Sequence, residues 1–318
     1  MQTADNIKMY KDSEIIRPCL LVLFLTTFIS ISCTDTMRNI TSDFIEISGS
    51  EISNDLFVYQ NAEVLNNSTM QDLQNRTKQT MVFADVFATR IDEITDLLET
   101  TSRYPAVRNI SYANLVDTEF MGIPEFSDIE KRNVAKYLLK NDSILGGIYF
   151  TLPNGDVYLG EPYSAQEQLP RLNFADRDWY KGVSKTNETY VSAVFLSAST
   201  RSPATAIALP VYQDDSNIKL MGYWVGIVNI GPLWKTIKDD YLPGGQELNV
   251  IDHEGTEMFN SGKYNYTEIQ SAPSFYENGN ATTIDKDSAT IRILEDNIVA
   301  ISYPIHIRSH VWTVTTIG

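Results

Sequence analysis

Apolar and small side chains recur at alternating steps of three and four residues between positions 70 and 98, and this pattern predicts one long helix with a buried seam. The seam consists of Met70, Leu73, Thr77, Thr80, Ala84, Phe87, Ile91, Ile94 and Leu98. We expect the helix to end before Tyr104-Pro105, because a residue that precedes proline avoids the helical region. Two partners suit such a seam: a second helix in a coiled coil, or a sheet domain packed along its length.

Short apolar segments separated by turn residues follow this helix and predict antiparallel sheets. Asn154-Gly155 lies between residues 144–152 and 157–159, and Asn-Gly between two β-rich segments is a strong hairpin signal. The capping-box pattern Ser127-Asp128-Ile129-Glu130 predicts a helix before this hairpin that runs to about Lys140.

A buried strand is expected at residues 223–230, and Gly231-Pro232 is expected to begin a short helix that ends near Tyr241. The same outline then repeats later in the chain. The second set of predicted elements comprises strands at 247–251 and 256–259 around a turn at 252–255, then strands at 289–294, 298–304 and 311–317. Two lobes of the α+β class in series are therefore predicted.

Residues 173–212 carry the most distinctive cluster of side chains. Asp176 is expected to cap a short helix that carries Arg177, Trp179 and Tyr180, because a carboxylate at this position accepts from free backbone N–H groups. A predicted hairpin follows, with strands at 190–196 and 204–212 around a turn at 200–203.

Arginine offers a planar fork of donors that grips a carboxylate at two points, and Trp and Tyr supply apolar walls with polar tips. Arg177, Trp179 and Tyr180 are therefore candidate ligand-binding residues. The alternative is that Arg177 pairs with an acid on the surface and that Trp179 is part of the core.

This region resembles the membrane-distal lobe of double Cache domains, the PAS-like ectodomains of chemoreceptors and sensor kinases. The resemblance rests on Arg-x-Trp-Tyr at 177–180, Tyr-Val-Ser at 190–192 and Ala-Leu-Pro-Val-Tyr at 208–212, and it extends from about residue 55 to residue 318. It implies a long N-terminal helix with two lobes, each an antiparallel sheet with flanking helices. The implied boundaries are 55–104 for the helix, 105–241 for the membrane-distal lobe with the ligand site, and 242–318 for the membrane-proximal lobe.

Members of this family that bind amino acids use the Arg and Trp for the ligand carboxylate, and they use aspartates and a tyrosine for its ammonium. By spacing, Ser197 and Asn229 occupy the two aspartate positions here, and Leu172 replaces the tyrosine. A buried ammonium without a counter-ion would cost several kcal/mol. We therefore expect a small carboxylate, or another anionic or neutral metabolite, bound by Arg177, Trp179, Tyr180, Ser197 and Asn229.

The N-terminus predicts export. Residues 19–32 are apolar or small but shorter than the roughly 20 residues that a spanning helix needs, which favours a signal peptide. The segment ends in Ile29-Ser30-Ile31-Ser32-Cys33, which resembles a lipobox and makes Cys33 the candidate lipidation site. The departure is Ser30, where leucine is more usual, and an uncleaved signal anchor is the alternative for residues 1–33. Residues 34–54 are polar and are expected to form a tether.

Composition excludes several classes of protein. A net charge of −16 and a pI near 4.6 argue against a nucleic-acid partner, whose phosphates require a basic surface. Both cysteines, Cys19 and Cys33, lie in the N-terminal segment, so no disulfide or thiolate site is expected in the body. His306 and His310 stand four apart but are expected on a hairpin turn, so we predict no metal, no cofactor and no enzymatic activity. Nine glycosylation sequons favour a cell-surface protein: Asn39, Asn66, Asn67, Asn75, Asn109, Asn141, Asn187, Asn265 and Asn280.

Two functions remain open at this point. The first is an extracytoplasmic sensor that binds a small molecule, is anchored to the membrane through its N-terminus and passes its state to a separate transmembrane signalling protein. The second is a surface-anchored structural or adhesive protein that keeps the fold without a ligand. A homodimer through the long helix is compatible with both.

Overall fold

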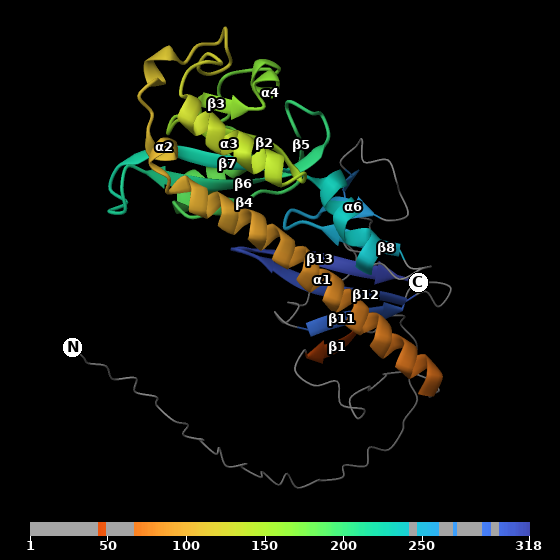
Figure 1. Ribbon diagram of the computed structural model, residues 1–318. Helices are drawn as coiled ribbons and strands as arrows, with labels where there is room; N and C mark the ends of the chain where they lie inside the picture. The colour runs from red at the N-terminus through yellow and green to blue at the C-terminus, as the bar shows by residue number, and fades with distance from the viewer. Residues whose placement is uncertain (1–43, 49–66, 242–246, 261–269, 272–287, 294–298) are drawn as a thin grey trace, which may run out of the picture. The chain divides into compact units, whose positions relative to one another are not determined.

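The computed structural model describes residues 44–48, 67–241, 247–260, 270–271, 288–293 and 299–318 (Figure 1). All of these belong to one compact unit, residues 42–318. Within the described residues the strands form two antiparallel sheets, one of six strands and one of seven. This is the α+β architecture that the sequence predicted. The signal segment and Cys33 lie outside the described residues.

The long helix α1 (Asn67–Ser102) carries the predicted seam, and the seam is buried against both sheets (Figure 1). From Leu73 to Leu98 every seam residue is at most 4 % exposed. The sheets therefore occupy the face that a coiled coil would need, and the sheet-packed alternative is confirmed. The helix is described from Asn67; the start expected near residue 55 lies outside the described residues.

The first lobe is built on the six-stranded sheet, whose order is β3-β2-β7-β6-β4, with β5 also paired to β6. Its strands are β2 (Leu145–Thr151), β3 (Val157–Glu161), β4 (Tyr190–Val191), β5 (Phe195–Leu196), β6 (Pro203–Tyr212) and β7 (Leu220–Asn229). Its helices are α2 (Pro105–Arg108), the 3₁₀ turn at Ala113–Leu115, α3 (Ile129–Asn141), α4 (Tyr163–Glu167) and α5 (Asp178–Thr186). The β2–β3 hairpin turns at the predicted Asn-Gly, where Gly155 adopts the positive φ of 89° that favours glycine.

The predicted capping box is displaced by one residue. Asp128, not Ser127, is the N-cap of α3, and its carboxylate accepts from the Lys131 amide at 3.3 Å. The same carboxylate accepts from the Tyr158 hydroxyl at 2.7 Å, which fixes it at the helix start. A buried tertiary partner thus decides which of two neighbouring cap residues is used.

The strand predicted at 190–196 is interrupted between β4 and β5. Side chains replace ladder partners there: the Ala206 amide donates to Ser192 Oγ at 3.0 Å, and the Val194 amide donates to Asp252 Oδ2 at 2.7 Å. These bonds satisfy the backbone without a regular ladder, which is why a β-rich sequence is not one continuous strand.

The second lobe contains the seven-stranded sheet, ordered β1-β11-β12-β13-β8-β9-β10, and α6 (Ile230–Tyr241) precedes it in the chain. Its strands are β1 (Phe44–Ser48), β8 (Glu247–Ile251), β9 (Thr256–Asn260), β10 (Gln270–Ser271), β11 (Ser288–Ile293), β12 (Val299–Ile307) and β13 (His310–Ile317). β1 corrects the expected tether, because residues 44–48 pair antiparallel with β11. Its alternating Ile45 and Ile47 are a period-2 signal too short to stand out in a polar segment.

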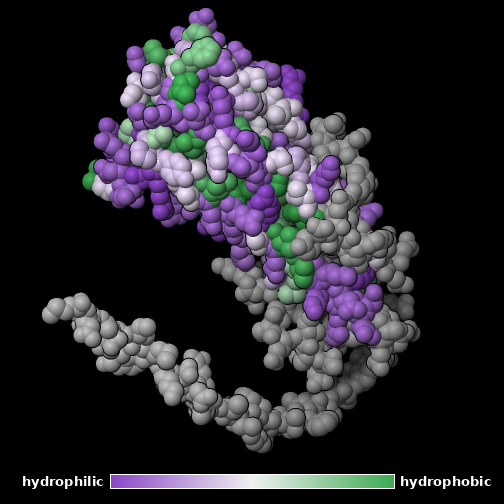
Figure 2. Space-filling view, viewed as in Figure 1, coloured by the Kyte–Doolittle hydropathy of each residue, from purple (hydrophilic) through white to green (hydrophobic). Residues whose placement is uncertain are grey.

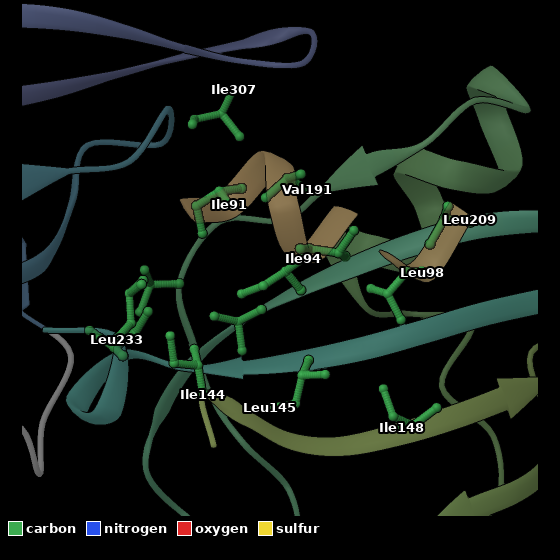
Figure 3. Close-up of a cluster of buried hydrophobic side chains, with 14 of the residues drawn as sticks. Ile91, Ile94, Leu98, Ile144, Leu145, Ile148, Val191, Leu209, Leu233 and Ile307 are labelled. Atoms are coloured by element: carbon green, nitrogen blue, oxygen red, sulfur yellow. The ribbon is translucent and has the colours of Figure 1, made fainter. Parts of the chain in front are cut away.

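One apolar core links α1 to both sheets. Ile91, Ile94 and Leu98 of α1 point toward strand and helix residues of the first lobe and toward Ile307 of β12 (Figure 3). The labelled partners from the first lobe and α6 are Ile144, Leu145, Ile148, Val191, Leu209 and Leu233. The coloured residues in Figure 2 are mainly hydrophilic, with apolar side chains in scattered patches. Among the described helices, none combines the length and the hydropathy needed to cross a membrane.

Replacing Phe87 with alanine should destabilise the protein strongly. Phe87 is fully buried, and its ring lies 6.5 Å from Phe83 and 5.9 Å from Trp312 of the second lobe. We expect Phe87→Ala to lower the free energy of unfolding by about 3–5 kcal/mol, measured by urea denaturation. Val82, 43 % exposed on the same helix, is the control, and Val82→Ala should change it by about 0.5 kcal/mol or less. Equal effects of the two changes would contradict the burial of the seam.

Candidate functional site

A small pocket opens on the face of the first sheet that is turned away from α1. Its volume is about 40 Å³, room for about three waters. The lining is mainly apolar and comprises Tyr149, Thr151, Val157, Leu169, Phe174, Arg177, Trp179, Phe195, Ser197, Ala198, Ser199, Val225 and Ile227. Three of the five predicted ligand-binding residues, Arg177, Trp179 and Ser197, are among them.

Arg177 is held at the pocket by the start of α5. It is the N-cap residue, with extended backbone angles, and Asp176, which was expected to cap the helix, pairs instead with Arg171. The Arg177 guanidinium lies 6.0 Å from the Phe174 ring and 5.7 Å from the Phe195 ring. Among the described residues, none accepts a hydrogen bond from this guanidinium or forms an ion pair with it. The guanidinium therefore keeps its donors for a ligand.

Trp179 and Tyr180 follow Arg177 but have different surroundings. Trp179 is buried and lines the pocket. Tyr180 does not line it: its hydroxyl donates to the Pro153 carbonyl at 2.6 Å, and its ring packs edge-on against Trp179, with centroids 6.0 Å apart. Adjacent residues of a helix point about 100° apart, so only one of the two can face the pocket.

Hydroxyl groups form a polar wall of the pocket. Ser197 Oγ lies 3.3 Å from Ser199 Oγ, and the Tyr149 hydroxyl donates to Ser199 Oγ at 3.3 Å. Burial raises the pKa of Tyr149, with the Ser199 hydrogen bond opposing, so this hydroxyl stays protonated at neutral pH and can donate. Thr151 Oγ1 is buried in the same wall and has no hydrogen-bond partner among the described residues.

Asn229 and Leu172 do not line the pocket. Asn229 is the last residue of β7, one pair of residues beyond Val225 and Ile227 on the same face, and its side chain fills the space above Gly146. A Cβ at Gly146 would lie 2.3 Å from Asn229 Nδ2. Leu172 packs on the apolar cluster around Trp179. The spacing along the chain predicted correctly that Asn229 lies on a strand of this sheet. It did not predict that the pocket lining on this strand ends at Ile227.

The sequence prediction missed Tyr149 and Thr151. Both belong to β2, and both face the pocket because alternate residues of a strand share a face. The sequence did indicate that both residues lie on a strand, because the predicted Asn-Gly hairpin includes residues 144–152. Its pairing with β7, which brings β2 to Val225 and Ile227, was not readable from the chain.

The charge in the described pocket lining is positive only. No acidic side chain belongs to the described pocket lining, and Arg177 is its one cationic residue. Such a site suits a small anion or a neutral molecule that accepts hydrogen bonds. A separate group of possible metal ligands, Asp178, His253 and Glu254, has donor atoms within 4.8 Å of one another but does not line the pocket. His306 and His310 lie at the end of the β12–β13 hairpin, as the sequence predicted.

Comparison with known proteins identifies the fold. No protein-family model matches the chain. Sporulation kinase D of Bacillus subtilis (strain 168) is 27% identical over 150 residues, which cover 47% of this chain and 28% of the kinase. The ligand-binding domain of the Pseudomonas fluorescens chemoreceptor CtaA, solved with L-isoleucine, superposes with a TM-score of 0.55 and 17% identity, covering 79% of this chain and 94% of that domain.

An extracellular ligand binding receptor from Desulfohalobium retbaense DSM5692 superposes with a TM-score of 0.53 and 11% identity, covering 75% of this chain and 40% of that chain. Identities this low establish the fold alone. The chain spans 28% of Sporulation kinase D and 40% of the Desulfohalobium chain. It has the fold of a double Cache sensor domain, with a long N-terminal helix, antiparallel sheets and flanking helices, as the sequence resemblance implied.

Replacing Thr151 with valine should stabilise the protein, because the change removes a buried hydroxyl that has no partner. We expect the free energy of unfolding to rise by about 1 kcal/mol. Thr205 is the matched control: it is equally buried, but its hydroxyl donates to the Ser192 carbonyl at 2.6 Å. Thr205→Val should lower the free energy of unfolding by about 1–3 kcal/mol. A similar loss in both variants would show that Thr151 is hydrogen-bonded in solution.

Proposed function

We propose that the protein is an extracytoplasmic sensor domain that binds a small carboxylate in the first lobe. The observation that carries the proposal is the Arg177 guanidinium, which reaches a mainly apolar pocket and has no partner among the described residues. A charged group with unused donors beside aromatic rings can offer charge-assisted hydrogen bonds to an anion. A bidentate carboxylate would satisfy it.

The remaining lining groups favour a ligand without an ammonium. Trp179 and the two phenylalanines wall the pocket, while Tyr149, Thr151, Ser197 and Ser199 offer hydroxyls. A free α-amino acid would bring an ammonium to a site whose described lining has no carboxylate. The CtaA domain was solved with L-isoleucine. We therefore infer that this pocket prefers small carboxylates or neutral acceptors to amino acids.

Export and anchoring complete the proposal. The body would be held outside the membrane by a lipid on Cys33 or by an uncleaved signal anchor, and it would pass its ligand state to a transmembrane signalling protein. The similarity to part of Sporulation kinase D and the extracellular receptors of the same fold support a sensory role.

The anchor prediction is tested by the intact mass of protein extracted from membranes. A lipoprotein should begin at Cys33 and carry a diacyl modification, because one acyl chain alone binds membranes only weakly. Cys33→Ala should then accumulate as the unprocessed precursor. A wild-type species that retains residues 1–32 would contradict lipidation and support the signal anchor.

The ligand prediction is tested by thermal-shift measurements of the full chain against carboxylates, the matching amides, α-amino acids, amines and purines. A carboxylate should raise the melting temperature, with a stabilisation of about 2.7 kcal/mol at 100 times its Kd. Arg177→Ala should abolish this shift. Arg171→Ala is the control, because Arg171 also stacks on Phe174, 5.0 Å from the ring centroid, but does not line the pocket.

Two results would contradict the proposal: tight binding of an α-amino acid, or a carboxylate response that Arg177→Ala leaves unchanged. The absence of a response to every compound would favour the structural or adhesive alternative, in which the fold is kept without a ligand.

A further inference from the structure

A second and larger groove opens at the edge of the first sheet, where β6 runs past the end of β4. β4 pairs with β6 only at Ile207 and Ala208, so the residues of β6 that follow have no described strand on this side. The groove has a volume of about 570 Å³, which lies in the range of pockets that hold small molecules. Its walls come from α1, α2, the α5–β4 loop, β6 and the β6–β7 turn, and no described residue lines both this groove and the Arg177 pocket.

The backbone of β6 argues against a peptide that adds a strand to this edge. Such binding needs backbone donors and acceptors along the open edge. The Ser192 amide donates to the Ala206 carbonyl at 2.9 Å, so Ala206 and, by alternation, Pro210 direct their backbone groups away from β7. Pro210 lines the groove and has no N–H to donate. The groove is therefore suited to a molecule that is bound by side chains.

The side chains of the groove include charges of both signs. Arg103 at the end of α1 and Glu188 in the α5–β4 loop are exposed, and neither side chain has a hydrogen-bond or ion-pair partner among the described residues. Arg108 of α2 donates to Asp215 of the β6–β7 turn at 2.6 Å, while its Nε is buried and has no described acceptor. These four charges balance, so neither a simple anion nor a simple cation is favoured.

A neutral molecule with many hydroxyl groups matches this lining. Each hydroxyl can both donate and accept, so neighbouring hydroxyls can bond to Arg103 and to Glu188 at the same time. The half-buried ring of Tyr212 also lines the groove and offers an apolar face to the C–H groups of a sugar ring. Among small molecules, a saccharide combines these two kinds of surface.

A glycosylation sequon forms part of the same wall. All three of its residues, 187–189, line the groove, and the Thr189 hydroxyl donates to Glu99 of α1 at 2.8 Å. The Asn187 side chain is exposed, and its amide has no hydrogen-bond partner among the described residues. Asn109 and Asn141 differ, because their side-chain amides form local hydrogen bonds of 3.0 Å and 2.7 Å. Asn187 therefore presents a free amide nitrogen to a groove that has the chemistry of a sugar site.

We propose that this groove is a carbohydrate-binding site, in which Arg103, Glu188 and Tyr212 hold a neutral saccharide. The saccharide has one of two sources: a glycan attached to Asn187, or a free sugar. For the attached glycan, a transferase joins its C1 to Asn187 Nδ2, the C1–O bond of a glycosyl phosphate donor breaks, and the released phosphate takes one amide proton. Both sources place the same hydroxyl groups against the same side chains.

A free sugar is tested by isothermal titration calorimetry on the full chain produced without glycosylation. The probes are glucose, galactose, N-acetylglucosamine, maltose, lactose and chitobiose, with glycine betaine and inorganic phosphate as charged competitors. Arg103→Ala and Glu188→Gln should each weaken sugar binding by about tenfold, because each removes hydrogen bonds to a charged group. Lys185→Ala is the control, since Lys185 is exposed on α5 but does not line the groove, and it should bind as the wild type does.

An attached glycan is tested on the full chain purified from the cells that naturally produce it. Glycopeptide mass spectrometry should find the glycan on Asn187. Melting temperatures are then compared for the wild type and Asn187→Gln, each with and without Arg103→Ala. If the glycan lies in the groove, Arg103→Ala should lower the melting temperature more in the glycosylated chain than in the Asn187→Gln background.

Tight sugar binding that needs Arg103 and Glu188, or coupling between the glycan and Arg103, would support the proposal and identify the source. The proposal is overturned if no sugar binds the unmodified chain and the native chain lacks either the glycan or this coupling. Sugar binding that both groove variants leave unchanged would place the site elsewhere, and a preference for glycine betaine or phosphate over every sugar would contradict a carbohydrate site. Arg177→Ala should leave all of these results unchanged, so they are independent of carboxylate binding.

Discussion

The structure depends on the burial of one face of α1 between two sheets. The N-terminal half of this helix holds the second lobe: Arg76 donates to the Val299 carbonyl at 2.9 Å, and Thr80 lies 2.7 Å from Thr316. The C-terminal half holds the first lobe, where Leu98 lies so close to Gly226 that a Cβ there would be 2.6 Å from the leucine. Among the described elements, α6 also contacts strands of both sheets, β6 and β7 of the first and β9 of the second, but less extensively than α1 does. Much of the apolar free energy of folding therefore acts through a single helix face.

The same contact also supports the pocket. Alternate residues of β7 point to opposite faces of the first sheet. Trp224 and Val228 pack in the core with α1, whereas Val225 and Ile227 line the pocket. The floor of the pocket is thus the reverse side of the α1 interface. A substitution that weakens the packing of α1 on β7 would therefore disturb the pocket even though the substituted residue does not line it.

The sequence predicted those features that local pattern determines. The seam of α1, the Asn-Gly hairpin and the helix that carries Arg177 and Trp179 each follow from spacing or from one turn. Features set by tertiary contacts were not accessible. Asp252, in a turn distant in sequence, accepts from the Val194 amide, and the β-rich segment is not a continuous strand there. The Tyr180 hydroxyl donates to the Pro153 carbonyl instead of facing the pocket, and Asn229 lies beyond the residues that line the pocket. Tyr149 and Thr151 needed the strand order, which no local pattern supplies.

Two adjacent residues at the start of α5 connect the pocket with the second lobe. Arg177 lines the pocket, whereas the Asp178 carboxylate accepts from the Tyr190 hydroxyl at 3.0 Å and from the Ala193 amide at 3.1 Å. The next amide, that of Val194, donates to Asp252 of the second lobe, and the Tyr190 ring stands edge-on to His310 at 4.8 Å. A carboxylate bound by Arg177 would therefore act on the helical turn whose next side chain holds the segment in contact with the second lobe. Thermodynamic linkage makes such an effect mutual: a change at this contact that ligand binding favours must strengthen ligand binding by the same factor.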